Sequence, residues 1–342
     1  MPGDRWTASD SRVLIHLRKT VNSRRNCRQN HRTRDSFGFA VSCVRIHLIP
    51  RGMSILASAP EGRSSIMSNS ALADSRRKLA YKQWEHCELC EHRCGVNRSA
   101  GERGPCHAGI EARVFRHRVE CGEEAELVPS HLFYLSGCDL RCAFCIAEAN
   151  AFDPSRGRLL TAEFFWQAVA WGQSHGARNV QWVGGEPTIH IPSILNAMSA
   201  CADLPAIVWK SDFYGTPQAF ELLADVVTVY VADFKFGNDD CATRIARVPD
   251  YVSVITRNLR IAAAQADLIV RHLVLPGHID CCFRPIIDWL RAEMPRVKFS
   301  VRDGYQPHWQ ARRHAELAAP LSRAEGDLAR QIAREAGLNV IA

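Results

Sequence analysis

From residue 131 onward, the pattern of apolar and polar positions alternates between short apolar runs and longer amphipathic stretches. The short runs predict buried strands at 131–136, 180–184, 206–210, 226–234, 268–275 and 298–302. The stretches with apolar residues every three or four positions predict helices at 161–175, 191–201, 216–224, 250–266, 280–293 and 322–336. Strands that alternate with helices indicate βα units and a parallel sheet.

Residues 1–70 lack this pattern. They are rich in Arg and Ser with weak periodicity, so we expect a disordered basic extension. A basic amphipathic transit peptide is the competing interpretation, and Asp4, Asp10 and Asp35 argue mildly against it.

Translation that begins later than Met1 is a third interpretation of the N-terminal extension. Met53 and Met67 are both candidate start sites. Met67 precedes a predicted helix at 71–84, and a chain that began there would lose no motif.

The charge of the chain is concentrated in that extension. The formal net charge is +7, but residues 1–66 alone carry +8, and residues 67–342 carry −1. The body of the protein therefore gives no electrostatic argument for nucleic-acid binding. No stretch approaches the ~20 continuous apolar residues of a membrane helix, so we expect no membrane span.

Three cysteines follow the first predicted strand in the spacing C-x3-C-x2-C: Cys138, Cys142 and Cys145. Thiolate sulfur suits iron–sulfur clusters, and a typical [4Fe–4S] site uses four cysteines. This loop offers three, which leaves one iron open to another ligand. Zinc is the alternative, but zinc sites usually close with four N or S ligands, and this loop has no fourth.

The second motif is Gly184-Gly185-Glu186, directly after the strand predicted at 180–184. Glycines after a strand let the backbone approach a ligand closely. By itself the motif is also compatible with an ordinary β-to-α turn. Its position about 40 residues after the three-cysteine loop makes a binding role the better interpretation.

Four further cysteines, Cys87, Cys90, Cys94 and Cys106, lie ahead of the first strand. Four soft ligands within 20 residues are enough to close a metal site. A structural zinc and an auxiliary iron–sulfur cluster both fit this second site. The alternative is that the four cysteines are free surface thiols that bind no metal.

The three-cysteine loop, with Phe144 just before its third cysteine, resembles the radical S-adenosylmethionine (SAM) superfamily. The resemblance implies a [4Fe–4S] cluster on that loop and SAM bound to the open iron. One electron from the cluster then cleaves SAM to a 5′-deoxyadenosyl radical, which abstracts a hydrogen atom. It also implies that Gly184, Gly185 and Glu186 bind SAM and that Phe144 packs beside the adenine.

The implied fold is α/β, a partial (β/α)6 TIM-like barrel of the radical SAM type, with ligands at the C-terminal strand ends. We expect a disordered tail at 1–70, a Cys-rich metal-binding segment at 71–125 and a radical SAM core domain at 126–342.

The block that runs from Cys87 to Arg98 and on through Gly104 to Cys106 narrows the resemblance. It is similar to the pyruvate formate-lyase-activating-enzyme-like radical SAM iron–sulfur proteins. This subgroup implies a flavodoxin- or ferredoxin-like reductant and a glycyl radical enzyme, or another protein, as substrate. Many members have Pro after the second cysteine, where this chain has Glu91.

Other predicted strand ends also carry polar residues. Ser211 and Asp212 could bond the SAM ribose, or cap a helix. Asp233 and Lys235 match an Asp-x-Lys of the activating enzymes that faces the active site, and a surface ion pair is the alternative. His272 fits either the SAM pocket or a buried core position.

Two adjacent cysteines, Cys281 and Cys282, open the helix predicted at 280–293. Adjacent cysteines do not easily close a normal disulfide, so we interpret them as free core or cap residues. The cysteine usage of this large chain indicates a reducing, cytoplasmic compartment. The rival function is a zinc-binding interaction module, in which both cysteine clusters are structural and no redox catalysis occurs.

Overall fold

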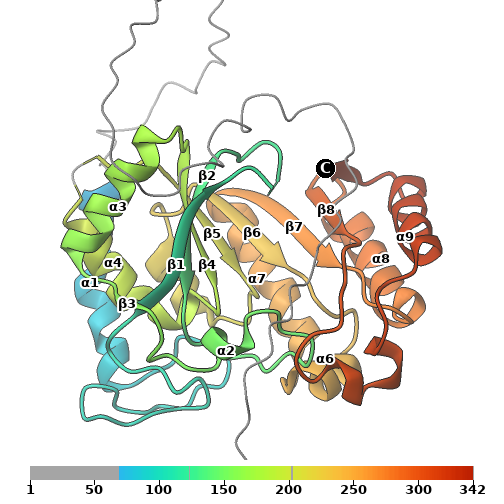
Figure 1. The fold of residues 1–342 in the computed structure, drawn as a ribbon, viewed down its shortest axis with the longest axis horizontal. Helices are drawn as coiled ribbons and strands as arrows, with labels where there is room; N and C mark the ends of the chain where they lie inside the picture. Colours follow the sequence, from blue (N-terminus) through green and yellow to red (C-terminus); the bar gives the residue numbers. More distant parts are fainter. Residues whose placement is uncertain (1–68, 123, 202, 342) are drawn as a thin grey trace, which may run out of the picture. The chain divides into compact units, whose positions relative to one another are not determined.

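The computed structural model describes residues 69–341 apart from positions 123 and 202. The predictions for the N-terminal extension and for the start codon therefore lie outside the described residues. The helix predicted at 71–84 is confirmed as α1 (Asn69–Glu85), which lies at the left of Figure 1.

The strands of the described residues form one sheet in the order β3-β1-β2-β4-β5-β6-β7-β8-β9. The six strands expected from the sequence run parallel to one another within it. They are β2 (Ser130–Leu135), β4 (Asn179–Gly184), β5 (Ala206–Ser211), β6 (Val229–Asp233), β7 (Asp267–Leu273) and β8 (Lys298–Arg302).

A helix follows each of these strands, as predicted. The helices are α3 (Ala162–Ser174), α4 (Ile191–Ser199), α5 (Pro217–Leu223), α7 (Tyr251–Gln265), α8 (Arg284–Glu293) and α9 (Arg323–Glu335). Figure 1 shows them along the outside of the curved sheet. The predicted partial (β/α)6 barrel is confirmed. Among the described residues, no helix is long and apolar enough to cross a bilayer.

Side-chain caps fix where several helices begin. The hydroxyls of Thr161, Thr216 and Ser322 each accept a hydrogen bond from the backbone N–H three residues later, at 3.1, 3.3 and 3.2 Å. Glu325 reaches back to the backbone N–H of Ser322 and completes a capping box. These caps satisfy N–H groups that the first helical turn leaves unpaired, so each loop switches to helix at a defined residue.

The sequence pattern missed three strands and two α-helices, and it merged two other helical elements into one. The missed elements are β1 (Arg113–Glu120), α2 (Glu148–Ala151), β3 (Arg158–Leu159), α6 (Asp239–Ala246) and β9 (Asn339–Ile341). β1 carries several charged side chains because it lies near the sheet edge, antiparallel to β2. The helix predicted at 280–293 is divided into a π-helical turn, η2 (Ile279–Phe283), and α8.

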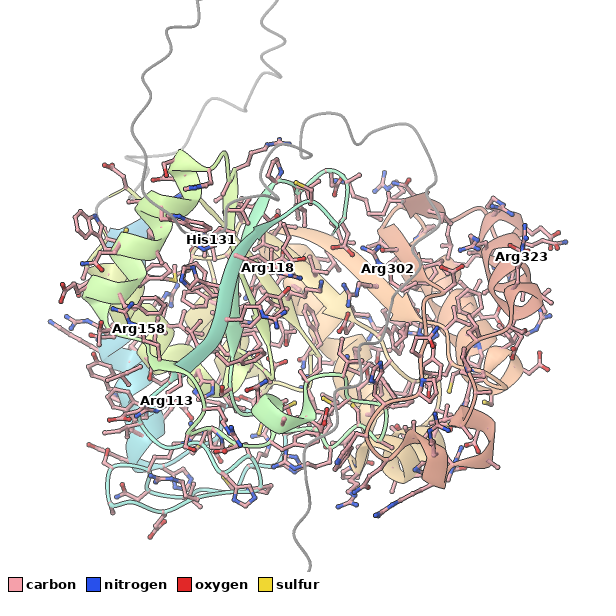
Figure 2. The ribbon with its side chains drawn as sticks, in the orientation of Figure 1. Arg113, Arg118, His131, Arg158, Arg302 and Arg323 are labelled. Atoms are coloured by element: carbon pink, nitrogen blue, oxygen red, sulfur yellow. The ribbon has the colours of Figure 1, made fainter. Side chains whose placement is uncertain are left out.

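A buried histidine joins β2 to the helical layer. His131, labelled in Figure 2, is 1% exposed and points at α3 where Gly172 leaves room; a Cβ on Gly172 would lie 2.2 Å from its Nδ1 atom. Its Nε2 atom is 3.0 Å from Nδ1 of His117. Burial, followed by the charges on His117 and His175, lowers the pKa of His131 to about 3. The ring is therefore neutral in the folded protein near neutral pH.

We predict that His131 makes the fold acid-sensitive. In the unfolded chain its pKa is about 6.5, so the unfolded state binds a proton as the pH falls from about 6.5 toward 3. The folded state does not bind this proton over the same range, because its pKa is about 3. The free energy of unfolding should decline over that range, and His131→Gln should reduce the slope by up to one proton. Urea unfolding at several pH values measures the slope; an unchanged slope in the variant would contradict the prediction.

Candidate active site

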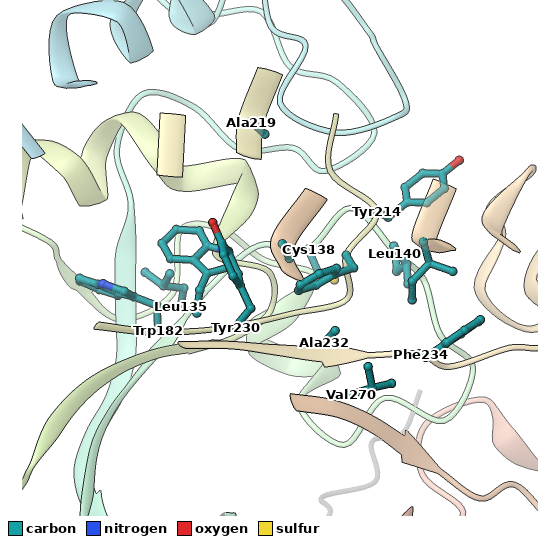
Figure 3. Close-up of a cluster of buried hydrophobic side chains, with 14 of the residues drawn as sticks. Leu135, Cys138, Leu140, Trp182, Tyr214, Ala219, Tyr230, Ala232, Phe234 and Val270 are labelled. Carbon is teal, nitrogen blue, oxygen red and sulfur yellow. The ribbon is translucent and has the colours of Figure 1, made fainter. Parts of the chain in front are cut away.

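The three-cysteine loop begins where β2 ends, in the interior of the fold. Cys138 and Cys142 are each 9% exposed, and Cys145 is half-buried. Figure 3 shows Cys138 among buried hydrophobic side chains that include Leu140 and Tyr214. The loop thus shields its sulfur atoms from water while it keeps them on one short segment.

The C-terminal end of α6 accepts backbone hydrogen bonds from this loop. The N–H groups of Arg141 and Ala143 donate to the carbonyl oxygens of Ala246 and Ile245 at 3.0 and 2.8 Å. The helix that the sequence pattern missed is therefore the element that fixes the loop between its first and third cysteines.

The Gly-Gly-Glu turn joins the same loop from the neighbouring strand. The N–H of Gly185 donates to Leu135 O and that of Glu186 donates to Gly137 O, both at 2.8 Å. A Cβ on Gly185 would lie 1.8 Å from Gly137 O, so only glycine permits this approach. Nε2 of the buried His190 donates to Ser136 O at 2.7 Å. The two motifs form one backbone unit.

Three residues predicted to bind SAM meet in this unit. Oε1 of Glu186 accepts hydrogen bonds from the Ser211 hydroxyl and the Thr188 N–H, both at 2.8 Å. Its Oε2 atom accepts from the N–H of Asp212 at 2.9 Å. The ends of β4 and β5 are thereby locked together at the C-terminal edge of the sheet.

Buried carboxyl groups gather beside the first cysteine. Ligand atoms of Cys138, Asp139 and Asp212 all lie within 4.8 Å of one another. Burial, reinforced by a neighbouring carboxyl, raises the pKa of Asp139 to about 7 and that of Glu186 to about 8. The same two causes raise the pKa of Asp212 well above its ordinary value. Such a group is suited to a cationic ligand, because a positive charge would stabilise the ionised carboxylates.

Burial also raises the pKa of the thiols in the three-cysteine loop. Burial raises the pKa of Cys142 to about 12 and raises that of Cys138 well above its ordinary value. Desolvated thiolates need a positive centre close by, and three of them on one loop form the donor set of an iron–sulfur cluster. The residues present therefore fit both a cubane cluster and a cationic ligand such as SAM.

An ion pair lies close to the three-cysteine loop, here also called the cluster loop. Lys235 Nζ is 2.8 Å from Asp233, and the two side chains are only 20% and 22% exposed. Arg271 Nε lies 2.9 Å from the other Asp233 oxygen. Although burial opposes it, Asp233 and Cys142 raise the pKa of Lys235. The Asp-x-Lys segment is therefore a largely buried, charged group near the cysteines rather than a surface pair.

The remaining two predicted SAM contacts are the ring side chains of Phe144, in the three-cysteine loop, and His272, on β7. Phe144 is half-buried, with its ring centroid 6.1 Å from that of Tyr305 and 6.4 Å from that of Phe236. His272 is buried, donates from Nδ1 to Phe234 O at 2.6 Å and packs against Phe283. It thus lies on the face of β7 opposite Arg271, toward the helices.

The Cys-rich segment packs against the cluster loop. Nε2 of His92 donates to Asp139 O at 2.9 Å, and Arg141 donates to Pro105 O at 2.6 Å. These contacts place the segment directly beside the loop that carries Cys138 and Cys142.

Two of the four cysteines of that segment, Cys87 and Cys106, lie beside a buried arginine, and among the described residues the four thiols do not converge on one point as ligands of a single ion would. Cys87, Cys90 and Cys106 are buried and Cys94 is half-buried; Sγ of Cys94 occupies the space where a Cβ on residue 104 would lie, 2.6 Å away. Arg98, 3% exposed, donates to Sγ of Cys106 at 3.8 Å. Burial raises the pKa of Cys106, and Arg98 offsets part of that effect.

Comparison with known proteins identifies the family. The family model described as the radical SAM superfamily matches residues 132–290. The uncharacterized protein MJ0674 of Methanocaldococcus jannaschii is 33% identical over 277 residues, which cover 79% of this chain and 80% of that protein. This chain belongs to the radical SAM superfamily. Its cofactors are accordingly a [4Fe–4S] cluster and SAM, and it is an enzyme that requires a reductant.

Solved structures of radical SAM proteins are similar to parts of the chain. SuiB of Streptococcus suis, bound to its precursor peptide SuiA, is 17% identical with a TM-score of 0.41; the match covers 59% of this chain and 46% of SuiB. A radical SAM methyltransferase from Sphaerobacter thermophilus is 14% identical with a TM-score of 0.43, over 79% of this chain and 92% of that enzyme. The chain thus spans less than half the length of SuiB.

Sequence reasoning missed several side chains at this radical SAM site. Asp139 and His190 carry no spacing signal, since their roles depend on contacts between separate strands. Glu124, fully buried, accepts from Arg302 at 2.6 Å and lies 3.8 Å from Arg271. Its only sequence signal is an acidic residue just ahead of a buried strand, which is too common to interpret.

We predict that Gly185→Ala separates the two motifs. The added Cβ would displace Gly137 or the Gly-Gly-Glu turn, at a cost of about 1–3 kcal/mol in unfolding free energy. A displacement of this size should lower the rate of SAM cleavage by about 100-fold. Gly304→Ala is the matched control, because a Cβ there meets nothing within 4 Å. Thermal unfolding and 5′-deoxyadenosine chromatography measure both effects; a Gly185→Ala enzyme as active as the control would refute the role of this contact.

Proposed function

We propose that Cys138, Cys142 and Cys145 hold the [4Fe–4S] cluster and that Gly184, Gly185, Glu186, Ser211 and Asp212 bind SAM. The observation that carries this proposal is the direct backbone bonding between the cysteine loop and the Gly-Gly-Glu turn. The buried carboxyls beside Cys138 support it, because they suit the positively charged ammonium and sulfonium groups of SAM. Phe144 is assigned to the outer part of the SAM pocket. The helix-facing position of His272 and its bond to Phe234 O favour the buried core alternative for that residue.

When bound, the reduced cluster supplies one electron that cleaves SAM to methionine and a 5′-deoxyadenosyl radical, which removes a hydrogen atom from the substrate. The residues of this chain position and shield that chemistry. Glu186 and Asp212 orient the ligand from two adjacent strand ends. The buried loop excludes water from the sulfur atoms, and Lys235 provides a positive charge next to Cys142. A flavodoxin- or ferredoxin-like protein supplies the electron.

We further propose that the substrate is a protein, in the manner of a glycyl radical enzyme activase. The support is the Cys87–Cys106 block and the Asp233-x-Lys235 segment, both similar to those of the pyruvate formate-lyase-activating-like subgroup. The largely buried ion pair beside the three-cysteine loop would then face the incoming peptide backbone. Family membership favours this redox role over a zinc-binding interaction module.

Cys87, Cys90, Cys94 and Cys106 form a proposed second metal site. Their spacing in the sequence, the burial of three of them and the packing of their segment against the three-cysteine loop support a bound zinc ion or an auxiliary iron–sulfur cluster. The segment that carries this second site packs against the three-cysteine loop, so a metal bound there would stiffen the surface on which that loop rests.

We expect SAM cleavage to depend on the three-cysteine loop. The full chain, reconstituted anaerobically with iron and sulfide and reduced with dithionite, should convert SAM to 5′-deoxyadenosine. Cys142→Ala should abolish this conversion, because two thiolates cannot hold the cluster. Cys201→Ala, at a buried thiol outside every metal-type group, is the control that should keep it. Equal activity in both variants, or iron without SAM cleavage in the unmodified protein, would refute the assignment.

We expect hydrogen abstraction from a glycine of the partner. With a candidate glycyl radical enzyme that carries glycine deuterated at Cα, deuterium should appear in 5′-deoxyadenosine, and a glycyl radical should appear in the electron paramagnetic resonance spectrum. A partner with Ala at that glycine is the control. SAM cleavage without deuterium transfer would leave the cofactor chemistry intact and rule out this substrate.

A further inference from the structure

A third group of cysteines lies away from the two sites described so far. It contains Cys241 on α6, His278 just before η2, and Cys281 and Cys282 within η2. One ligand atom from each of the four residues lies within 4.8 Å of all the others. The residues come from segments 37 positions or more apart, so the fold, not local sequence, brings them together.

The burial of these residues differs from the sequence-based interpretation. Cys241, His278 and Cys282 are buried, but Cys281 is exposed, so the adjacent pair is not simply part of the core. Both thiols of the pair face the imidazole of His278, at 3.2 Å for Cys281 and 3.7 Å for Cys282. The exposed position of Cys281 provides a path by which an ion can enter.

The donor atoms have the spacing of a tetrahedral zinc site. Sγ of Cys281 is 3.9 Å from both Sγ of Cys241 and Sγ of Cys282. Nδ1 of His278 is 3.6 Å from Sγ of Cys241. With Zn–S bonds of about 2.3 Å and Zn–N bonds of about 2.0 Å, a tetrahedron places its sulfurs about 3.8 Å apart and a sulfur about 3.5 Å from the nitrogen.

Two other uses of these thiols fit the distances less well. A disulfide needs its sulfurs about 2.05 Å apart, far closer than the spacing here. In a cubane cluster each cysteine binds a different iron, so its sulfurs stand farther apart than ligands of a single ion. A three-sulfur, one-nitrogen set around one point is a donor set typical of zinc.

The neighbouring residues are arranged as a second shell. Asn238 caps α6 by accepting from the N–H of Cys241 at 2.8 Å, and its amide nitrogen lies 3.3 Å from Sγ of Cys241 and 2.6 Å from the carbonyl oxygen of Cys281. Nε2 of His278 is 3.7 Å from a carboxylate oxygen of Glu316. Amide donors to thiolates and a carboxylate beyond the imidazole are the outer partners that metal ligands usually have.

The backbone is also shaped to bring α6 against η2. A Cβ on Gly237 would lie 2.2 Å from the carbonyl oxygen of Cys282, so the chain just before α6 can make this contact only with glycine. The ligands on η2 lie in a π-helical turn, a distortion that is frequent at functional sites.

We propose that Cys241, Cys281, Cys282 and Nδ1 of His278 bind one Zn²⁺ ion in a closed structural site. The ion joins α6 to η2 and so links the loops that follow β6 and β7. Since α6 also accepts the backbone hydrogen bonds of Arg141 and Ala143, the zinc stabilises the helix on which the three-cysteine loop rests. All four ligands come from the protein, so the site binds no substrate.

The test is the metal content of the full chain, purified anaerobically from cells grown with added zinc. Elemental analysis should find one equivalent of zinc that Cys281→Ser and Cys241→Ser each remove. Cys281→Ser is the more informative variant. The side chain of Cys281 is exposed, so its replacement should leave the fold intact, and a loss of zinc then reports the loss of a ligand. Thermal unfolding confirms that each variant is folded, and its midpoint should fall when the zinc is absent.

Two controls separate this site from the others. Cys201→Ser should keep all of the zinc, and Cys90→Ser should keep the equivalent that Cys281→Ser removes, even if the Cys-rich segment also binds zinc. Iron bound to the three-cysteine loop should remain in Cys281→Ser. A folded Cys281→Ser protein with the same zinc content as the unmodified chain would overturn the proposal, and so would iron loss in place of zinc loss.

Discussion

The active site depends on two backbone hydrogen bonds that tie the last residue of β2 and the loop after it to the turn after β4. Parallel strands bring their C-terminal ends to one edge of the sheet, but that alone leaves the two loops free to diverge. Here the N–H of Gly185 donates to the last residue of β2 and the N–H of Glu186 donates into the cysteine loop. The missing side chain of Gly185 allows this approach. One rigid contact therefore positions both the proposed cluster ligands and the proposed SAM ligands.

This arrangement is electrostatically unfavourable without its cofactors. Burial raises the pKa of Asp139, Glu186 and the cluster-loop thiols, so the protein by itself holds these groups with their charged forms disfavoured. The hydrophobic packing of the barrel offsets that cost, and the proposed cationic ligands would reduce it. Site and scaffold thus make opposite contributions to stability, as expected where function demands desolvated charge.

The sequence predicted the parts of this protein whose physical cause is local. Apolar periodicity located six of the seven parallel strands of the described sheet, because a strand buried on both faces needs a continuous apolar run, and it missed only the three-residue β9. The spacing of Cys138, Cys142 and Cys145 on one loop was equally readable. The pattern did not reveal β1, since a strand near the sheet edge with charged side chains resembles a loop. It also missed α6, whose eight residues are too few for a clear period.

Contacts between distant segments were beyond the reach of the sequence. Cys281 and Cys282 were interpreted as isolated residues because their partner thiol lies 40 positions earlier, on the helix that the pattern missed. Once α6 is placed, the same helix carries Cys241 at one end and supports the cysteine loop at the other. A constraint on the first turn of α6 must therefore act on the cluster loop, since a helix of two turns transmits a displacement of one end to the other with little bending. The stability of the active site is in this way coupled to residues that contact neither cofactor.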